Sequence, residues 1–385
     1  MNAKDFLREI YPKILAFKLA YHGLIKVPKP ITLTFSVTNL CQSRCKTCKI
    51  WQIYPEKHQK PGDELTADEI ARIFKSMGRV YFFNISGGEP FLRKDLPEIV
   101  ELAVDYLQPR ILHAPTNALA PEKVLRHTRA ILEMLQMKGL NTPFTIKPSL
   151  DGIGRLHDEI RGVEGNWERL LETVQGLREL GKQFSNLHIE IGTVVSNFNK
   201  DRLDEIEEYV HTMGVQSYRN EIAEQREEFL NMGDPITPTG EEYGRLMESF
   251  ANKILGNLHT KKTLARMTES LRLVYYELAT RIIKENRQVI PCYAGISNVH
   301  LTPYGDLWSC CVLGYKKPMG NLRERGYDFW KVWHSPRADE IRKSIRNKEC
   351  ACPLANQAYS NILCHTPSLI KTLLNILKYR RASYC

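Results

Sequence analysis

The chain has 385 residues, with 54 lysine and arginine residues against 44 aspartate and glutamate residues, and therefore a formal net charge of +10. Hydrophobic residues make up 43% and charged residues 25%, which is ordinary for a globular protein and excludes a disordered or fibrous chain. No uncharged apolar run approaches the roughly 20 residues that a membrane-spanning helix needs, and no signal-peptide pattern is present, so we expect a cytoplasmic protein.

The positive charge is concentrated at the two ends of the chain. Residues 1–50 carry a net charge of +7 and residues 366–385 a net charge of +4, so the long middle is nearly neutral. Because a nucleic-acid binder would carry its charge on the body, we predict no nucleic-acid partner. Both ends are amphipathic if helical, with Ile10, Ile14 and Phe17 on one face of the first. They either dock on the body as ordinary helices or lie on an anionic membrane surface, which would make the protein peripheral at the inner membrane.

Strand and helix signals alternate along residues 31–235. Apolar, β-branched segments predict strands, and segments with helical periodicity lie between them. Thr66 and Glu69 form a capping-box pattern, Asp95 is a predicted helix cap, and Gly181 is a predicted helix end. The predicted strands are residues 31–37, 80–85, 110–115, 144–150, 187–195 and 216–222, and the main helices begin at Thr66, Asp95, Pro121, Asn166 and residue 200. Six such units predict an α/β fold with a parallel sheet, open or curved into a partial (β/α)6 TIM-like barrel, and a site at the carboxyl ends of its strands.

After residue 235 the pattern changes. Residues 239–288 predict two helices that begin at a second capping box, and we expect a helical connector on the barrel, with a substrate-covering lid as the alternative. A compact region with many cysteines and turn signals follows. The predicted segments are a basic amphipathic helix (1–30), the α/β core (31–235), the helical connector (236–289), a small C-terminal domain with most of the later cysteines (290–365) and a basic amphipathic tail (366–385).

The ten cysteines are the strongest chemical signal. Structural disulfides are rare inside cells, so this number favours metal ligation, and the cysteines form two groups with a long stretch between them that has none. The first group is Cys41, Cys45 and Cys48, directly after the first strand. Three thiolates at this spacing suit a cubane iron–sulfur cluster with one open iron, where a small molecule can bind. Zinc, which would need a fourth ligand nearby, is the alternative.

This loop resembles the C-x3-C-x2-C loop of the radical S-adenosylmethionine superfamily, and the resemblance covers about residues 30–365. The sequence GGEP at the end of the second strand is similar to the superfamily motif that meets the methionine amino group, where only glycine lets the backbone approach closely. One departure is Ala118, which replaces the glycine of the TNG segment. The resemblance implies that S-adenosylmethionine is bound by Gly87, Gly88, Glu89, Asn117, Ser149, Asp151, Arg161, Val194 and Val195.

The second cysteine group resembles the SPASM and twitch extensions of the same superfamily. Its first half fits the pattern C-x(9–15)-G-x4-C, whereas its second half offers too few cysteines for two auxiliary clusters. Cys311 is expected to be a small buried residue, and a zinc-binding knob is the alternative for the region. The implied ligands of one auxiliary [4Fe-4S] cluster are Cys292, Cys310, Cys350 and Cys352, with Cys364 as the reserve fourth ligand.

The resemblance implies a radical SAM enzyme, that is, an oxidoreductase or transferase that reductively cleaves S-adenosylmethionine to a 5′-deoxyadenosyl radical and abstracts hydrogen from an unactivated C–H bond. It also implies a one-electron donor of the flavodoxin or ferredoxin type and an auxiliary cluster that assists oxidation or coupling. Only some thirty residues precede the first strand, too few for the peptide-recognition domain of many SPASM proteins, so we expect a small-molecule, sugar or lipid-linked substrate. The alternatives are a peptide-modifying SPASM maturase and a non-catalytic iron–sulfur or electron-transfer protein.

Overall fold

The computed structural model describes residues 3–57, 59–261 and 263–381, and these divide into two compact units. The larger unit comprises Pro30–Thr237 and Val299–Asp339, and the smaller comprises Met1–Lys29, Pro238–Asn298 and Glu340–Cys385. The five segments expected from the sequence remain a prediction, because these two units group residues by their spatial contacts and each combines segments that are distant in the sequence.

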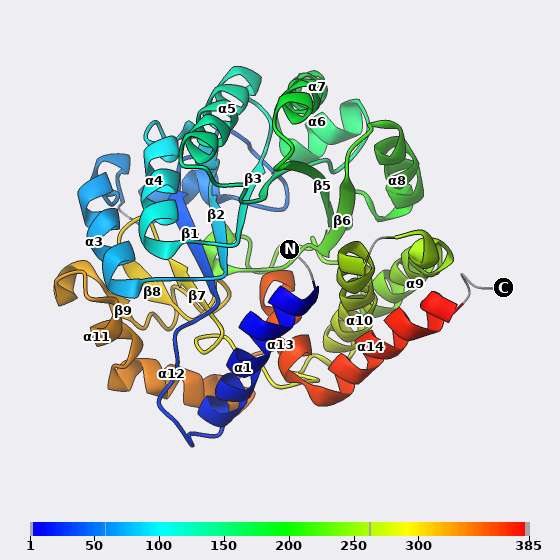
Figure 1. The fold of residues 1–385 in the computed structure, drawn as a ribbon. Coiled ribbons are helices and arrows are strands. Elements are labelled where there is room, and N and C mark those ends of the chain that lie inside the picture. Colours follow the sequence, from blue (N-terminus) through cyan, green and yellow to red (C-terminus); the bar gives the residue numbers. More distant parts are fainter. Residues whose placement is uncertain (1–2, 58, 262, 382–385) are drawn as a thin grey trace. The chain divides into compact units, whose positions relative to one another are not determined.

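The larger unit is built on a nine-stranded sheet in the order β6-β5-β4-β3-β2-β1-β7-β8-β9. The first six strands pair in parallel, and the hairpin that follows is antiparallel. The strands are β1 (Thr32–Thr38), β2 (Phe82–Gly87), β3 (Ile111–Thr116), β4 (Phe144–Pro148), β5 (Leu187–Val195), β6 (Ser217–Ile222), β7 (Asn298–Leu301), β8 (Asp306–Trp308) and β9 (Gly320–Asn321). The expected partial (β/α)6 barrel is confirmed, and Figure 1 shows β1 to β6 along an arc with the helices outside it.

Strand alternation places apolar side chains on the helix side of this sheet and polar side chains on its other face. In β1, Leu33 and Phe35 are buried on the side of the helices, and Phe35 packs edge-on against Phe74 at 6.0 Å between ring centroids. The alternate residues Thr34 and Ser36 are polar, and the Ser36 hydroxyl is hydrogen-bonded to His300 of β7 at 2.8 Å. The helices of this unit are α2 (Ile53–Glu56), α3 (Ala67–Met77), α4 (Leu96–Leu102), α5 (Pro121–Met137), α6 (Arg155–Arg161), α7 (Asn166–Gln183), α8 (Leu203–Thr212) and α11 (Phe329–Trp333).

Two local predictions are wrong. Asp95 stands at the N-cap position of α4, but its carboxylate accepts hydrogen bonds from Arg93 and makes no capping bond. Helix α7 continues through Gly181 to Gln183. Glycine disfavours a helix interior by only about 1 kcal/mol, and the buried Leu177 and Leu180 hold this last turn against the core.

The smaller unit is helical. It contains α1 (Ala3–Tyr21), α9 (Gly240–Asn257), α10 (Thr263–Glu285), α13 (Ala355–Cys364) and α14 (Thr366–Arg381), while α12 (Pro336–Arg346) begins in the larger unit. Helix α10 packs against α9, α13 and α14, and α1 packs against α13. The two helices predicted for residues 239–288 are thus confirmed, including the capping box of Thr239 and Glu242. Within the described residues, no helix is long and apolar enough to cross a membrane.

Glu69 joins the hairpin strands to the barrel helices. Its carboxylate accepts hydrogen bonds from the Arg323 Nε (2.7 Å) and Nη2 (2.8 Å) and from the Tyr327 hydroxyl (2.7 Å), and it also completes the capping box with Thr66. The bonds from Arg323 are the main reason that the pKa of Glu69 falls to about 2.

We therefore expect Glu69→Gln to lower the free energy of unfolding at pH 7 by roughly 2 kcal/mol, less than the full pKa shift implies because the pair is partly solvated. The lowered pKa stabilises the fold above the unfolded value of 4.5 and loses this effect as the pH falls toward 2. Urea unfolding of both proteins should therefore show a difference that shrinks below about pH 4.5. A difference that is constant with pH would contradict the ionic origin of the effect.

Candidate functional site

The cysteine loop leaves the carboxyl end of β1 and is fastened to the end of α6. The Arg44 amide donates to the Arg161 carbonyl at 3.0 Å, and the Lys46 amide donates to the Ile160 carbonyl at 2.8 Å. Gly162 makes this contact possible, because a Cβ there would lie 2.2 Å from the Arg44 carbonyl oxygen, and its φ of +68° is left-handed. Cys45, which is buried, lies between these two bonds, and the partly buried Cys41 and Cys48 lie on either side of them.

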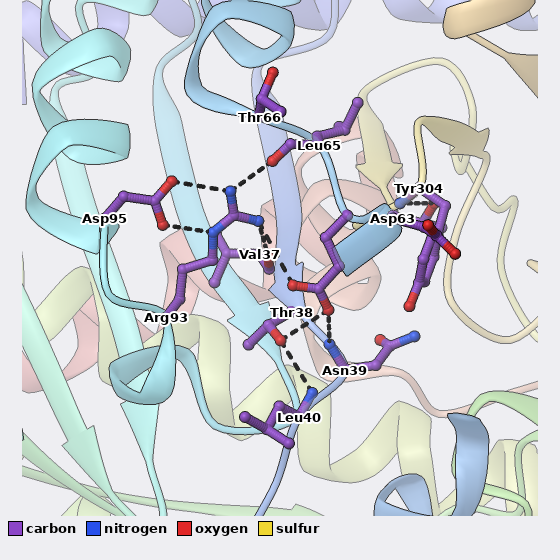
Figure 2. A network of polar contacts seen from close by, with 12 residues as sticks. Val37, Thr38, Asn39, Leu40, Asp63, Leu65, Thr66, Arg93, Asp95 and Tyr304 are labelled. Carbon is purple, nitrogen blue, oxygen red and sulfur yellow. Dashed lines mark hydrogen bonds and ion pairs between the residues drawn. The ribbon is translucent and has the colours of Figure 1, made fainter. Parts of the chain in front are cut away.

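A polar network fixes the start of the loop, and Figure 2 shows it around Arg93. The Arg93 guanidinium donates to the carbonyls of Val37 and Leu65 and to the Asp95 carboxylate. Glu64 accepts from the Thr38 hydroxyl at 2.8 Å and from the Asn39 amide at 3.1 Å. These bonds hold the last residues of β1 just before Cys41.

We expect Arg93→Lys to lower the free energy of unfolding by about 2–3 kcal/mol, because an ammonium cannot reach the same acceptors as the buried, forked guanidinium. The matched control is Arg126→Lys, which changes an exposed arginine of α5 that forms only a surface ion pair. Urea unfolding measures both. Equal losses in the two variants would show that the network does not hold the loop.

Gly87 and Gly88 let the end of β2 pass against the cysteine loop. A Cβ at Gly87 would lie 2.1 Å from the Thr38 carbonyl oxygen, and one at Gly88 would lie 2.4 Å from that of Leu40. The Gly88 and Glu89 amides donate to these same two carbonyls, each at 2.8 Å. The sequence predicted glycines here because a side chain would block the ligand. The structure shows a second requirement, because a side chain at either position would also clash with the backbone that leads into the cysteine loop.

Glu89 connects this turn to the end of β3. The buried carboxylate accepts from the Asn117 amide at 2.6 Å, the Thr116 hydroxyl at 3.0 Å and the Phe91 amide at 3.2 Å. Burial nevertheless raises the pKa of Glu89 to about 7. Asn117, oriented in this way, directs its side-chain Nδ2 toward the Cys41 sulfur at 3.7 Å. Two predicted cofactor residues are therefore joined to one predicted cluster ligand.

Asp151 and Arg161 form a buried ion pair beside the same loop. The Arg161 Nη1 donates to the Asp151 carboxylate at 3.0 Å, whose other oxygen accepts from the Val194 amide at 2.8 Å. Ser149 lies at the end of β4, where its amide donates to the Thr116 carbonyl at 2.9 Å. Val194 is half-buried and Val195 buried, and as strand neighbours their side chains point to opposite faces. The side chains of these two predicted S-adenosylmethionine contacts therefore do not face the same side of β5.

The residues fit an iron–sulfur cluster and S-adenosylmethionine. Burial raises the pKa of all three thiols, that of Cys41 to about 12, so thiolates here need a cationic neighbour. Arg161 lies close enough to lower the pKa of Cys41 and Cys45 in part, and its buried Nε has no hydrogen-bond partner. Such a donor suits the carboxylate of the methionine group. Among the described residues, no three His, Cys, Asp or Glu side chains surround a single metal position, whereas a cubane cluster binds each thiolate through a different iron.

The smaller unit brings three cysteines of the second group together. Cys292, Cys350 and Cys352 line one cavity beneath α10 and α13. The Gln288 side chain donates to the Cys350 carbonyl at 3.2 Å and lies 3.9 Å from its sulfur. Cys364 is buried at the end of α13 and does not line this cavity. Cys310 follows β8 in the larger unit.

Sequence reasoning missed a charged cluster after β6. The Arg226 guanidinium pairs with Glu224 and donates to the sulfur of the buried Cys311 at 3.3 Å. Burial raises the pKa of the neighbouring Glu228 to about 7, and Arg226 opposes this effect. The alternation Glu-x-Arg-x-Glu directly after a predicted strand was the available signal. The expectation that Cys311 is a buried residue is confirmed, but its thiol also has this polar partner.

Two hydrogen bonds tie the segment after β6 to the cysteine loop. The Asn231 side chain donates to the Thr47 carbonyl at 2.8 Å, and the Lys49 amide donates to the Phe229 carbonyl at 2.8 Å. The charged cluster therefore belongs to the same end of the barrel as the predicted cluster ligands.

Comparison with known proteins assigns the chain to a family. Residues 35–210 match the model of the radical SAM superfamily, and residues 292–353 match that of the SPASM iron–sulfur cluster-binding domain, together well over half of the chain. An AdoMet-dependent heme synthase of Methanosarcina barkeri is 24% identical over 83% of this chain and 86% of its own length. A PqqA peptide cyclase of Granulibacter bethesdensis is 28% identical over 51% of this chain and 48% of its own.

A similar fold occurs in Streptococcus suis SuiB bound to its precursor peptide SuiA, with a TM-score of 0.58, 16% identity, and coverage of 89% of this chain and 72% of that one. This likeness supports the barrel and its C-terminal extension. The resemblance inferred from the motifs is confirmed, as are the cofactors that it implied. The chain belongs to the radical SAM superfamily, with a radical SAM domain that binds a [4Fe-4S] cluster and S-adenosylmethionine, and a SPASM domain that binds an auxiliary iron–sulfur cluster.

Proposed function

We propose that this radical SAM enzyme modifies a peptide by abstracting a hydrogen atom from one of its C–H bonds. The supporting observation is that half of this chain matches a PqqA peptide cyclase and that this chain also carries a SPASM domain. The small-molecule substrate that the sequence favoured rested on the short segment before β1. The relatives support the alternative, the peptide-modifying maturase, more strongly.

The chain's own residues hold and orient the reactants. Cys41, Cys45 and Cys48 would ligate the cluster, while Arg161 would bind the carboxylate of S-adenosylmethionine and Glu89 would keep Asn117 beside the cluster loop. When bound, the reduced cluster and S-adenosylmethionine supply a 5′-deoxyadenosyl radical. The electron would come from a one-electron donor of the flavodoxin or ferredoxin type.

The first experiment tests the radical chemistry. The anaerobically reconstituted protein, reduced with dithionite, should release 5′-deoxyadenosine and methionine from S-adenosylmethionine, as measured by liquid chromatography and mass spectrometry. Failure to release 5′-deoxyadenosine from a preparation with full iron content would contradict an enzymatic function.

The second experiment tests the peptide. Short peptides encoded beside the gene would be prepared in deuterated form and incubated with the reduced enzyme. The substrate should transfer one deuterium to 5′-deoxyadenosine and lose two hydrogen atoms if a cross-link forms. An undeuterated copy of the same peptide serves as the control for solvent-derived hydrogen.

A small-molecule substrate is the second candidate, because the relative named as a heme synthase matches 83% of the chain. Deuterium transfer from a labelled low-molecular-mass cell extract, with no transfer from any of the peptides, would favour this candidate over the peptide.

A further inference from the structure

Helix α14 has its apolar side turned outward. Its buried positions include the polar Ser368 and Thr372, which face the body of the smaller unit. Four large aliphatic side chains remain exposed along one face, with exposed fractions of 51% at Ile370, 50% at Leu373, 58% at Leu374 and 56% at Leu377. Their spacing of three and four residues places them in one stripe.

The first helix of the same unit shows the usual arrangement. In α1 the apolar residues Ile10, Ile14 and Phe17 are buried. Both helices are therefore amphipathic in sequence, but only α1 places its main apolar face in the core. The stripe of α14 is not exposed because the end of the chain is loosely packed. This helix contacts α10 and α13 along its inner side.

The charged residues of the segment that carries the stripe are all of one sign. Residues 366–385 contain four basic residues and no acidic residue. Lys371 is paired with Glu277 of α10, and the remaining three basic residues of this segment follow Leu377 in the sequence. Two copies of α14 brought together along the stripe would bring these like charges together, which is unfavourable. A negatively charged surface would instead satisfy both the apolar stripe and the basic end of the helix.

We propose that the stripe Ile370, Leu373, Leu374 and Leu377 docks on an anionic lipid membrane, with α14 lying in the plane of the interface. The side chains would enter the boundary between headgroups and acyl chains, and the basic residues would lie among the lipid phosphates. This anchoring is independent of the substrate, because the larger unit carries the radical SAM site and the stripe belongs to the smaller unit.

Co-sedimentation of the full-length protein with vesicles tests the proposal. The wild type should bind vesicles of phosphatidylcholine and phosphatidylglycerol, bind vesicles of phosphatidylcholine alone less, and lose affinity at high salt. Leu374→Ser/Leu377→Ser removes two apolar groups without changing the charge and should weaken binding about tenfold or more. The matched control is Met137→Ser/Leu140→Ser, which removes two exposed apolar groups, 81% and 40% exposed, from the larger unit and should bind as the wild type does.

Three outcomes would overturn the proposal. The first is wild-type protein that stays in the supernatant with anionic vesicles at low salt. The second is equal binding by the two double variants. The third is a dimer, detected by light scattering, that Leu374→Ser/Leu377→Ser dissociates while vesicles leave it unchanged, since a second copy would then cover the stripe. Circular dichroism of each variant checks that its helices are kept.

Discussion

Replacing Cys41 by alanine should abolish release of 5′-deoxyadenosine and lower the iron content from about eight to about four atoms per chain. The reason is that Cys41 is held in place from three directions: by the end of β1, by the glycine turn after β2 and by the Asn117 side chain. The other two cysteines of the loop, Cys45 and Cys48, are already assigned as ligands, so neither can replace Cys41. Iron analysis and the dithionite assay measure the two effects.

The matched control for this variant is Cys311→Ala. Cys311 is also buried and also has a polar neighbour, Arg226, but it is not among the predicted ligands. We expect it to keep all of its iron and its cleavage activity. Retained activity in Cys41→Ala, or equal iron loss in Cys311→Ala, would contradict the assignment of the loop as the cluster site.

Replacing Cys350 by alanine should have the second large effect, the loss of about four iron atoms per chain with cleavage of S-adenosylmethionine retained. Modified substrate should no longer form, because the auxiliary cluster is lost while the radical SAM cluster remains. Cys350 lines the cavity that also contains Cys292 and Cys352. Iron analysis with electron paramagnetic resonance distinguishes the two clusters by their spectra.

The comparison variant is Cys364→Ala, which tests the reserve ligand. Cys364 lies outside the cavity, so its replacement should leave iron content and spectra unchanged. Equal iron loss in both variants would make Cys364 a ligand, and unchanged turnover in Cys350→Ala would remove Cys350 from the auxiliary site.

The sequence predicted the barrel well because its signals are local and repeated. Both ends of each of the six strands lie within about two residues of the predicted positions, and the capping box at Thr66 forms as expected. Gly181 was misjudged because the buried Leu177 and Leu180 hold α7 against the core beyond it, and Asp95 because Arg93, two residues earlier, binds its carboxylate. Propensity at a single residue is weaker than such packing and side-chain contacts.

The site was predicted from motifs, but its supporting residues were not. Glu64 and Arg93 act on the cysteine loop through backbone carbonyls and amides, and such bonds leave no pattern in a sequence. Ala118 is a similar case. The motif departure was visible, yet only the structure shows that Ala118 keeps a left-handed φ of +58°, the conformation for which glycine is best suited.

The place of β1 in the sheet has a consequence for the apoprotein. This strand has a neighbour on both sides, β2 and β7, so the cysteine loop begins at an interior strand and not at an edge. Its amides should therefore be among the slowest to exchange with deuterated solvent. Removal of the cluster would leave this anchorage intact, so protein damaged by oxygen should keep a folded barrel and recover its cluster when iron and sulfide are supplied again.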